Sequence, residues 1–261
     1  MAIPRVLHKV IVVDGGGIPS LSTPAQEALA SFSELNPEYE MRVYGGRDCE
    51  NYIIKHYGEK ELDAFRSLVP YSFKVDLFKF LVLYNEGGVY SDFRQVCLKP
   101  FREYIPTYAK WFSSTDGGSK HHGGMACHFL AAAPGQPTFR TAIDMIIANV
   151  ARRDYACCML GVTGPCLLGR AFRTTPPLAP SYVGEFRIRG LEMVDHMGQG
   201  GLIVHKHRKP GGGGYGGADW SSSEGGNNYS QLYAARRVYT GHDTVNPGQI
   251  KVGGRRSWWL F

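Results

Sequence analysis

The sequence predicts an α/β protein, and two observations predict that class. Short runs rich in β-branched residues alternate with longer runs whose apolar residues recur at helical spacing, and glycine, proline or asparagine separates them. The 261 residues are 43% hydrophobic and 20% charged, which provides for a sizeable core and excludes a disordered or collagen-like chain. We therefore expect a globular protein in which strands and helices follow one another.

The first expected element is a buried strand over residues 3–13, a run that is rich in Val and Ile and ends at Asp14 and three glycines. Ligands of open α/β sheets bind beyond the carboxyl ends of strands, so this end is a candidate ligand site. A helix follows as far as residue 35, with Thr23 as its cap and Pro24 at its first position. A strand over 39–44 and helical turns over 48–57 and 60–68 continue the β-α-β-α order.

Residues 74–92 are the most informative segment. Their apolar side chains recur at helical spacing as far as Gly87, which is typical of a helix C-terminal cap, and a short strand over 89–92 follows. Asp76 and Lys79 are three residues apart, so they lie on one face of the predicted helix. Such a pair is also common as an ordinary surface ion pair, and spacing alone leaves both interpretations open.

Asp92 ends that short strand, at the edge where α/β sheets bind their ligands. A carboxylate there is a candidate for contact with a ligand. Asp92 and Arg94 would share one face if the strand continued beyond Asp92, because side chains alternate along a strand.

Fewer helices and strands are predicted for the second half of the chain. We expect a loop over 113–124, a strand over 127–133, a helix over 137–153, a helical stretch interrupted at 163–165 and a helix over 229–239.

Residues 198–226 contain eleven glycines and the basic run that begins at His205 and includes Lys206, Arg208 and Lys209. Glycine has high chain entropy and no side chain to bury, so this segment is expected to be mobile unless a ligand orders it. Two interpretations stay open, a plain loop and a lid that closes over a phosphate group.

The formal net charge is +6, and residues 131–261 carry the excess, with 15 Lys and Arg against 8 Asp and Glu. A basic half is compatible with nucleic acid, a membrane surface or a phosphate-bearing ligand. No apolar run has the roughly 18–20 residues that a bilayer span needs, and the start lacks the pattern of a secretory signal. We therefore expect no membrane span and a cytoplasmic location, unless the chain is a trimmed one.

The six cysteines form no Cys-x-x-Cys pattern, which argues against a zinc or thioredoxin-like site. Scattered cysteines are typical of buried free thiols in a reducing compartment. The adjacent pair Cys157 and Cys158 is not expected to form a bridge within itself.

Five blocks of the sequence carry a resemblance to a known family. They are Ile3-Pro4-Arg5-Val6-Leu7-His8, Asn36-Pro37-Glu38-Tyr39-Glu40, Lys74-Val75-Asp76-Leu77-Phe78-Lys79, Gly87-Gly88-Val89-Tyr90-Ser91-Asp92 and Thr163-Gly164-Pro165. Together they resemble the successive blocks of the Och1-like, DXD-containing sugar glycosyltransferases (family 32), with Asp76 and Asp92 at the family's separation. The chain is most similar to the variant from large DNA viruses, which has a basic residue at the second acidic DXD position and a terminal Tyr-x-x-Leu-Trp helix, similar here to Tyr229–Tyr233.

The resemblance implies a GT-A fold, a single Rossmann-like mixed sheet flanked by helices. It implies one domain over 1–261, with a nucleotide-sugar-binding half at 1–100 and an acceptor half at 101–261. The implied activity is transfer of a hexose, with glucose from UDP-glucose favoured over mannose from GDP-mannose, to a glycan, protein or other hydroxyl acceptor with retention of configuration. If the chain is viral, the implied location is the host cytoplasm.

The resemblance also assigns roles to residues. Asp92 is implied as the catalytic carboxylate that contacts ribose, donor sugar or a metal. Asp76 is implied to accept from ribose or sugar hydroxyls, and Lys79 to contact the donor. These roles suit the chemistry, because sugar hydroxyls need ionised acceptors and a diphosphate leaving group needs a cation. The remaining donor-binding residues implied are Lys74, Tyr90, Arg94, Gly164 and Pro165.

Three positions depart from the family pattern. Arg94 stands at the second acidic DXD position, Ile11 stands where the family has a base-stacking Trp, and Cys127 stands where it has an Asn before an Ala-rich strand. With Arg94 the usual two-carboxylate clamp for Mn²⁺ or Mg²⁺ is incomplete, so we expect weak metal dependence. The resemblance implies Asp92 and His205 as the candidate ligands, and a plain surface histidine is the other interpretation of His205. Arg94 itself is a candidate to neutralise diphosphate oxygens.

Two other functions stay open from the sequence. One is a catalytically silent module that binds a nucleotide sugar or a glycan. The other is a nucleic-acid binder, which rests only on charge and on the aromatic residues Trp258 and Trp259, and no nucleic-acid-binding motif supports it.

Overall fold

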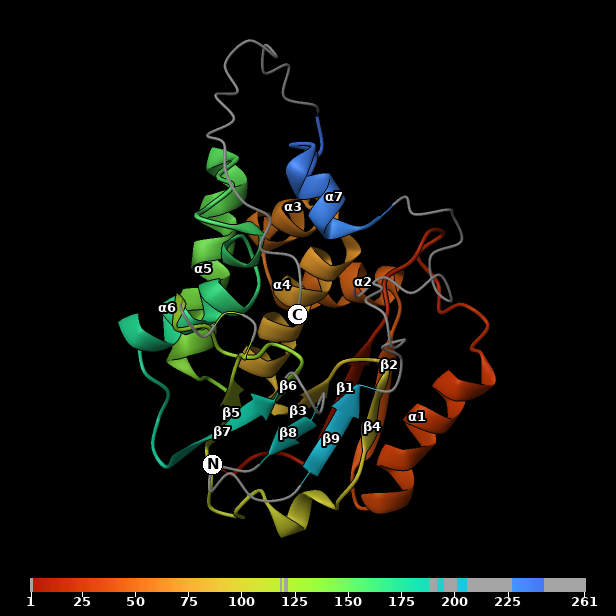
Figure 1. Cartoon of the computed structure of the whole chain (residues 1–261). Coiled ribbons are helices and arrows are strands. Elements are labelled where there is room, and N and C mark those ends of the chain that lie inside the picture. The colour runs from red at the N-terminus through yellow and green to blue at the C-terminus, as the bar shows by residue number, and fades with distance from the viewer. Residues whose placement is uncertain are drawn as a thin grey trace.

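The computed structural model describes residues 2–117, 119, 122–187, 192–194, 201–205 and 227–241. Within these residues nine strands form one mixed sheet with helices packed on both faces (Figure 1). The strands are β1 (Val6–Val10), β2 (Glu40–Tyr44), β3 (Gly88–Ser91), β4 (Gln95–Cys97), β5 (Trp111–Thr115), β6 (Phe129–Ala132), β7 (Ser181–Arg187), β8 (Glu192–Val194) and β9 (Gly201–His205). The helices are α1 (Thr23–Leu35), α2 (Gly46–His56), α3 (Glu59–Ser67), α4 (Tyr71–Asn85), α5 (Pro137–Arg152), α6 (Pro165–Thr174) and α7 (Tyr229–Ala234), with short 3-10 turns at Phe101–Glu103 and Met159–Gly161.

The strand order across the sheet is β2-β1-β3-β6-β5-β7-β8-β9-β4. β1 is parallel to β2 and β3, and β5 is parallel to β7, while the other neighbouring strands are antiparallel. The predicted α/β class with a single mixed sheet flanked by helices is confirmed. Strands from both halves of the chain belong to this one sheet.

Alternation of side chains along the strands builds two cores. In β3, Tyr90 faces the helices of the large core on one side, and Val89 faces α1 and Phe101 on the other. The large core contains most of α4, whose side chains are buried almost continuously from Leu77 to Leu83. A helix that is buried on all sides exposes its polar residues only to other protein groups, and Lys79 lies within this run.

The chain leaves the sheet at Asp92. β3 and β4 are joined only by Asp92, Phe93 and Arg94, but β3 is third in the sheet order and β4 is ninth. The strand therefore ends at Ser91 and does not continue, so the condition under which Asp92 and Arg94 would share a strand face is not met. A carboxylate at such a break is fixed by the strand that precedes it.

Gly87 and Gly88 form the turn into β3, the strand that ends at this break. Gly88 has φ +99°, and a Cβ there would lie 2.6 Å from the Val6 carbonyl oxygen and 3.0 Å from Nε2 of His8. A side chain at this position would disfavour the backbone conformation and push β3 away from β1.

We expect Gly88→Ala to destabilise the protein by about 2 kcal/mol or more, because it adds strain at a positive φ to a backbone clash. Gly17→Ala is the matched control, since a Cβ there meets nothing within 4 Å. Urea unfolding of both variants checks this, and equal stabilities would contradict it.

His8 is fully buried in β1. Its Nε2 donates to the Gly87 carbonyl oxygen over 2.9 Å, and Nδ1 lies 3.2 Å from the Tyr44 hydroxyl. Burial lowers the pKa of His8 to about 4, although the bond to Gly87 acts in the opposite direction. The unfolded chain therefore binds a proton between about pH 6.5 and pH 4 that the native protein does not bind.

Stability is accordingly expected to fall by up to about 3 kcal/mol as the pH drops through that window, and to be retained above it. His8→Gln keeps a donor for Gly87 and removes the titration, so its stability should depend less on pH. Urea unfolding at pH 7 and pH 4.5 measures both slopes, and parallel slopes would refute the assignment.

Several predicted element boundaries are wrong. β1 is shorter than residues 3–13, and α7 ends at Ala234 instead of 239. Ser22, and not Thr23, is the N-cap residue of α1, so Pro24 is at the second helical position instead of the first. Val238 and Tyr239 are nonetheless buried, because Tyr239 forms a bridge with Leu68.

No helix among the described residues has both the length and the apolar character that a bilayer crossing requires. Of the glycine-rich segment 198–226, only 201–205 are described, and these form β9. The expected lid residues Lys206, Arg208 and Lys209 and the aromatic end at 255–261 lie outside the described residues.

Candidate functional site

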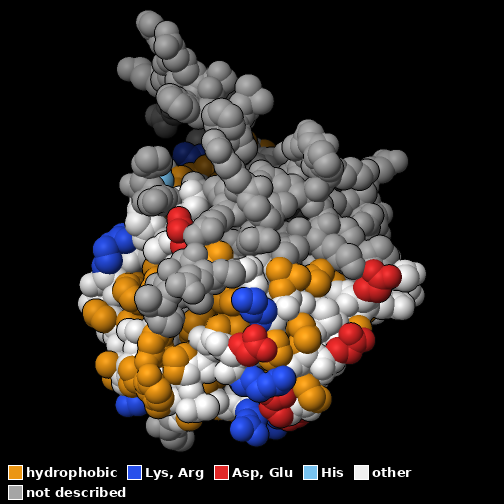
Figure 2. Space-filling model, turned by 60° about the horizontal axis from the view of Figure 1, so that its bottom comes forward, with side chains coloured by type: hydrophobic (Ala, Val, Ile, Leu, Met, Phe, Trp, Pro, Cys, Tyr) orange, Lys and Arg blue, Asp and Glu red, His pale blue; other side chains and the backbone are white. Residues whose placement is uncertain are grey.

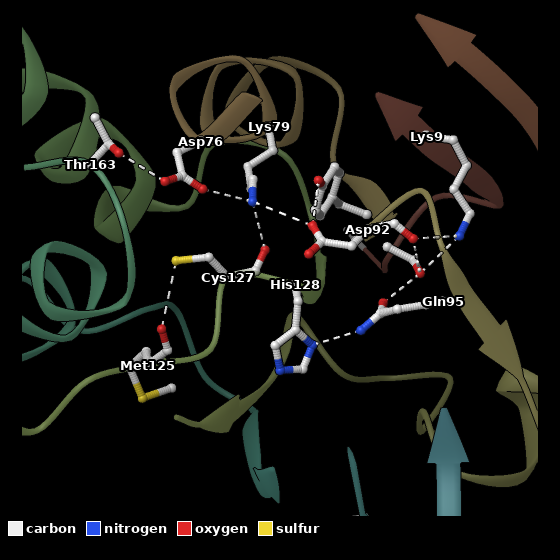
Figure 3. A network of polar contacts seen from close by, with 11 residues as sticks. Lys9, Asp76, Lys79, Asp92, Gln95, Met125, Cys127, His128 and Thr163 are labelled. Carbon is white, nitrogen blue, oxygen red and sulfur yellow. Dashed lines mark hydrogen bonds and ion pairs between the residues drawn. The ribbon is translucent and has the colours of Figure 1, made fainter. Parts of the chain in front are cut away.

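A cluster of four polar side chains lies where β3 ends (Figure 3). It consists of Asp76 and Lys79 from α4, Tyr90 from β3, and Asp92. We call these four residues the carboxylate cluster. The sequence predicted all four as site residues, and the structure brings them together.

Lys79 is the centre of the carboxylate cluster. Its Nζ lies 2.9 Å from Oδ1 of Asp76 and 3.7 Å from Oδ1 of Asp92, and it donates to the Cys127 carbonyl oxygen over 2.9 Å. Its side chain is only 3% exposed and lies over the Tyr90 ring. The pair with Asp76 is therefore not the ordinary surface ion pair that spacing alone allowed. The Lys79 ammonium group therefore faces two carboxylates, a carbonyl oxygen and an aromatic ring of the protein.

Asp92 is held from several directions. Its backbone N–H donates to the His128 carbonyl oxygen over 2.8 Å, and its Oδ1 accepts from the Tyr90 hydroxyl over 2.7 Å. Its carbonyl oxygen accepts from Nζ of Lys9 over 3.2 Å. The side chain is nevertheless 38% exposed, against 13% for Asp76. Asp92 is thus the fixed carboxylate of the cluster that solvent or a ligand reaches.

Asp76 is fixed by the segment that precedes α6. Thr163 Oγ1 donates to Asp76 Oδ2 over 2.8 Å. Gly164 is the N-cap residue of α6, and a Cβ there would lie 3.4 Å from the same carboxylate oxygen. Thr163 and Gly164 are thereby brought to the carboxylate cluster, with Thr163 making the polar contact.

A second polar chain lies on the other side of Asp92, and sequence reasoning missed it. Nζ of the buried Lys9 donates to the Ser91 hydroxyl over 2.9 Å, and that hydroxyl donates to Oε1 of Gln95 over 2.7 Å. The Gln95 amide nitrogen in turn lies 2.8 Å from Nδ1 of His128. A lysine inside a strand whose neighbours are mostly buried was the available signal, since a buried lysine needs partners.

The two lysines respond differently to burial. Burial lowers the pKa of Lys9 to about 7, and Asp92 opposes that shift only in part. Burial acts on Lys79 in the same direction, but the carboxylates of Asp76 and Asp92 outweigh it and hold its pKa well above the ordinary value. Burial, followed by the Asp92 charge, raises the pKa of Tyr90 well above its usual range. At neutral pH Lys79 is therefore charged, and Tyr90 is a neutral donor.

Lys74 does not lie with the carboxylate cluster. Its Nζ donates to the carbonyl oxygens of Phe65 and Arg66, over 2.6 and 3.3 Å, at the end of α3. Five residues along a helix correspond to a rotation of about 140°, so Lys74 and Lys79 face different sides of α4. Burial lowers the pKa of Lys74 to about 8.

The other predicted positions have mixed placements. Arg94 is half-buried in the turn after Asp92. His205 ends β9, where its backbone pairs with Gln95 of the polar chain described above, and its side chain lies outside the described residues. Ile11 is buried against Leu29 in a small apolar core, and no stacking aromatic occupies that position. Cys127 is buried, and its carbonyl oxygen makes the contact with Lys79.

The residues around Asp92 do not fit a metal site made by the protein alone. No group of three His, Cys, Asp or Glu side chains with suitable geometry occurs in the described part of the chain. Oδ1 of Asp92 already faces the Tyr90 hydroxyl and Lys79, and the second DXD position is Arg94. A divalent ion here would need most of its oxygens from a ligand.

The surface in Figure 2 bears on the nucleic-acid interpretation. On that face acidic and basic side chains are interspersed, and no continuous basic area crosses it. Much of the basic excess of the second half lies at 206–209 and 242–261, outside the described residues. The described part of this face therefore lacks the electrostatic footprint of a nucleic-acid binder.

Comparison with known proteins places these residues in a family context. Residues 23–111 match the model of the glycosyltransferase sugar-binding region containing a DXD motif, and this stretch includes the whole carboxylate cluster. The initiation-specific alpha-1,6-mannosyltransferase of Candida albicans is 32% identical over 77 residues, which are 29% of this chain and 20% of that protein. HOC1 of Saccharomyces cerevisiae is 29% identical over 84 residues, or 31% of this chain and 21% of that protein.

The matches thus span about a fifth of the length of these curated relatives. Among solved structures, the PaToxG glycosyltransferase superposes with a TM-score of 0.52 at 14% identity, over 66% of this chain and 69% of that chain. A likeness at this identity concerns the fold. The protein therefore has the α/β fold of GT-A type, and its residues 23–111, with Asp76 and Asp92, are similar to the sugar-binding region of DXD-containing glycosyltransferases.

Proposed function

We propose that this protein is a glycosyltransferase that moves a hexose from a nucleoside diphosphate sugar to a hydroxyl acceptor, with retention of configuration. The observation that carries the proposal is Asp92. It is a partly exposed carboxylate at the break between β3 and β4, held by Tyr90, Lys79, His128 and Lys9. A carboxylate oriented in this way is suited to contact the hydroxyls of a sugar or ribose.

The roles of the cluster follow from its contacts. Asp92 contacts the donor directly, and Asp76, at 13% exposure, offers a second acceptor at the wall formed by Thr163 and Gly164. Lys79 lies behind both carboxylates, so we assign it to holding their geometry. The charge of the diphosphate then needs another cation, and Arg94 is the nearest basic residue along the chain.

For the donor we propose UDP-glucose, which the resemblance implied. GDP-mannose is the second candidate, because the matched Candida protein is named as a mannosyltransferase. The acceptor is proposed to be a glycan or a protein hydroxyl. The division into a donor half at 1–100 and an acceptor half at 101–261, the viral origin and the cytoplasmic location remain predictions.

Isothermal calorimetry with UDP-glucose and GDP-mannose, each with and without Mn²⁺, tests the proposal, together with an assay for sugar released from the donor. We expect one donor to bind and to be hydrolysed slowly without acceptor. Binding without release in the presence of any acceptor would favour the silent binding module. No binding of either donor would refute the proposal, and oligonucleotide binding that falls steeply with salt would restore the nucleic-acid function.

Metal removal is a separate prediction. With Arg94 at the second DXD position, we expect EDTA to lower the activity only in part, because a divalent ion would arrive mainly on the donor phosphates. Arg94→Asp supplies a second carboxylate and should make the activity depend strongly on Mn²⁺. Complete loss of native activity in EDTA, restored by micromolar Mn²⁺, would contradict the role given to Arg94.

A further inference from the structure

Three thiols lie in a row at the ends of the segment that carries Thr163 and Gly164, and the proposed function does not use them. The sulfur of Cys158 is 3.9 Å from that of Cys157 and 3.8 Å from that of Cys166. All three are free thiols. Cys157 is exposed, Cys158 is half-buried and Cys166 is buried at the start of α6, so the row leads from solvent into the protein. The other three cysteines are each buried elsewhere in the core.

Cys158 and Cys166 are the pair suited to a disulfide. A disulfide between adjacent residues closes a strained eight-membered ring, which disfavours the Cys157–Cys158 pair. Cys158 and Cys166 come from two different elements, the N-cap of the Met159–Gly161 turn and the first turn of α6. Their sulfurs, 3.8 Å apart, need to approach by less than about 2 Å to reach bonding distance.

The segment between these two cysteines carries the wall of the carboxylate cluster. Thr163, which donates to Asp76, and Gly164, whose Cβ position lies 3.4 Å from the same carboxylate, are both within it. A bond between Cys158 and Cys166 would close this segment into a small ring. If closing the ring moves Thr163, the hydrogen bond from Thr163 to Asp76 changes with it.

From this geometry we infer that Cys158 and Cys166 are a redox modification site, oxidised by a small-molecule disulfide, and that their bond changes the Thr163–Asp76 contact. The effect on Asp76 rests on the proposed function, whereas the bond itself does not. The thiolate of Cys158 attacks one sulfur of the small disulfide and releases a first small thiolate. Cys166, as thiolate, then attacks the Cys158 sulfur and releases the second.

Two protein thiols are oxidised, one disulfide is reduced to two thiols, and the two protein protons pass to the leaving thiolates. Burial, and next the neighbouring Cys158, raise the pKa of Cys166 to about 12. Because the thiolate is the reacting form, the ring-closing step should become faster as the pH rises from 7 to 9.

Mass spectrometry of the full chain after incubation with oxidised glutathione, against a dithiothreitol control, tests the bond. Trypsin leaves all three cysteines in the peptide from Asp154 to Arg170, so a second cut after Leu160 is needed to separate Cys158 from Cys166. We expect the two fragments to stay linked until reduction. Cys157→Ser should keep the link, and Cys158→Ser and Cys166→Ser should each lose it.

A Cys157–Cys158 link, a link only between two chains, or fully alkylatable thiols after prolonged oxidation would each overturn the inference. The consequence for Asp76 is tested by calorimetry with UDP-glucose and GDP-mannose on both redox forms. We expect binding several-fold weaker in the oxidised protein and no redox effect in Cys158→Ser. Equal affinities in the two forms would overturn the link to Asp76. If neither form binds a donor, the proposed function fails while the peptide analysis still decides the bond.

Discussion

Asp92→Asn is expected to lower donor turnover by about 10²-fold or more while leaving the fold intact. The amide has the shape of the carboxylate, and its oxygen still accepts from the Tyr90 hydroxyl that lies 2.7 Å from Oδ1. What is lost is the negative charge at the one carboxylate of the cluster that is 38% exposed. The measurement is sugar release from UDP-glucose or GDP-mannose, with a thermal melt to monitor folding.

Asp144→Asn is the matched control for this experiment. Asp144 is also an ion-paired carboxylate, bonded to Arg140, but it is 63% exposed on α5 and lies outside the carboxylate cluster. Its turnover should match that of the native protein. A large fall in melting temperature with turnover retained in Asp92→Asn would show that Asp92 is structural.

The largest effect on stability is expected from Lys79→Met, a loss of about 3–5 kcal/mol. The substitution removes the cation that lies 2.9 Å from Asp76 and 3.7 Å from Asp92, and it leaves the Cys127 carbonyl without that donor. Asp76 is then a mostly buried carboxylate without its counter-ion. Urea unfolding at pH 7 measures the loss.

Two further variants separate charge from packing. Lys74→Met lies on the same helix and removes an amine whose hydrogen bonds go to the carbonyl oxygens of Phe65 and Arg66, so we expect a loss nearer about 1 kcal/mol. Asp76→Asn combined with Lys79→Met removes both charges and should recover part of the stability of the single variant. Equal losses for Lys79→Met and Lys74→Met would contradict the role of Lys79 as the counter-ion of the cluster.

The sequence by itself determined the fold class and the local features that follow from helix and strand periodicity. Helical spacing fixed α4, and with it the shared face of Asp76 and Lys79. Gly87 and Gly88 marked the turn into β3, and the strand pattern placed Asp92 at its end. These features could be predicted because neighbouring residues with periods of 3.6 and 2 generate them.

Only the tertiary structure decided which groups surround those residues. Lys9 meets Ser91, Lys79 meets the Cys127 carbonyl, and Thr163 meets Asp76 across separations of 48 to 87 residues. It also decided that the chain passes after Asp92 into β4, the last strand in the sheet order, and that Lys74 turns toward α3 instead of the cluster. No local period encodes such contacts, because they arise when strands distant in the sequence pair and the helices pack over them.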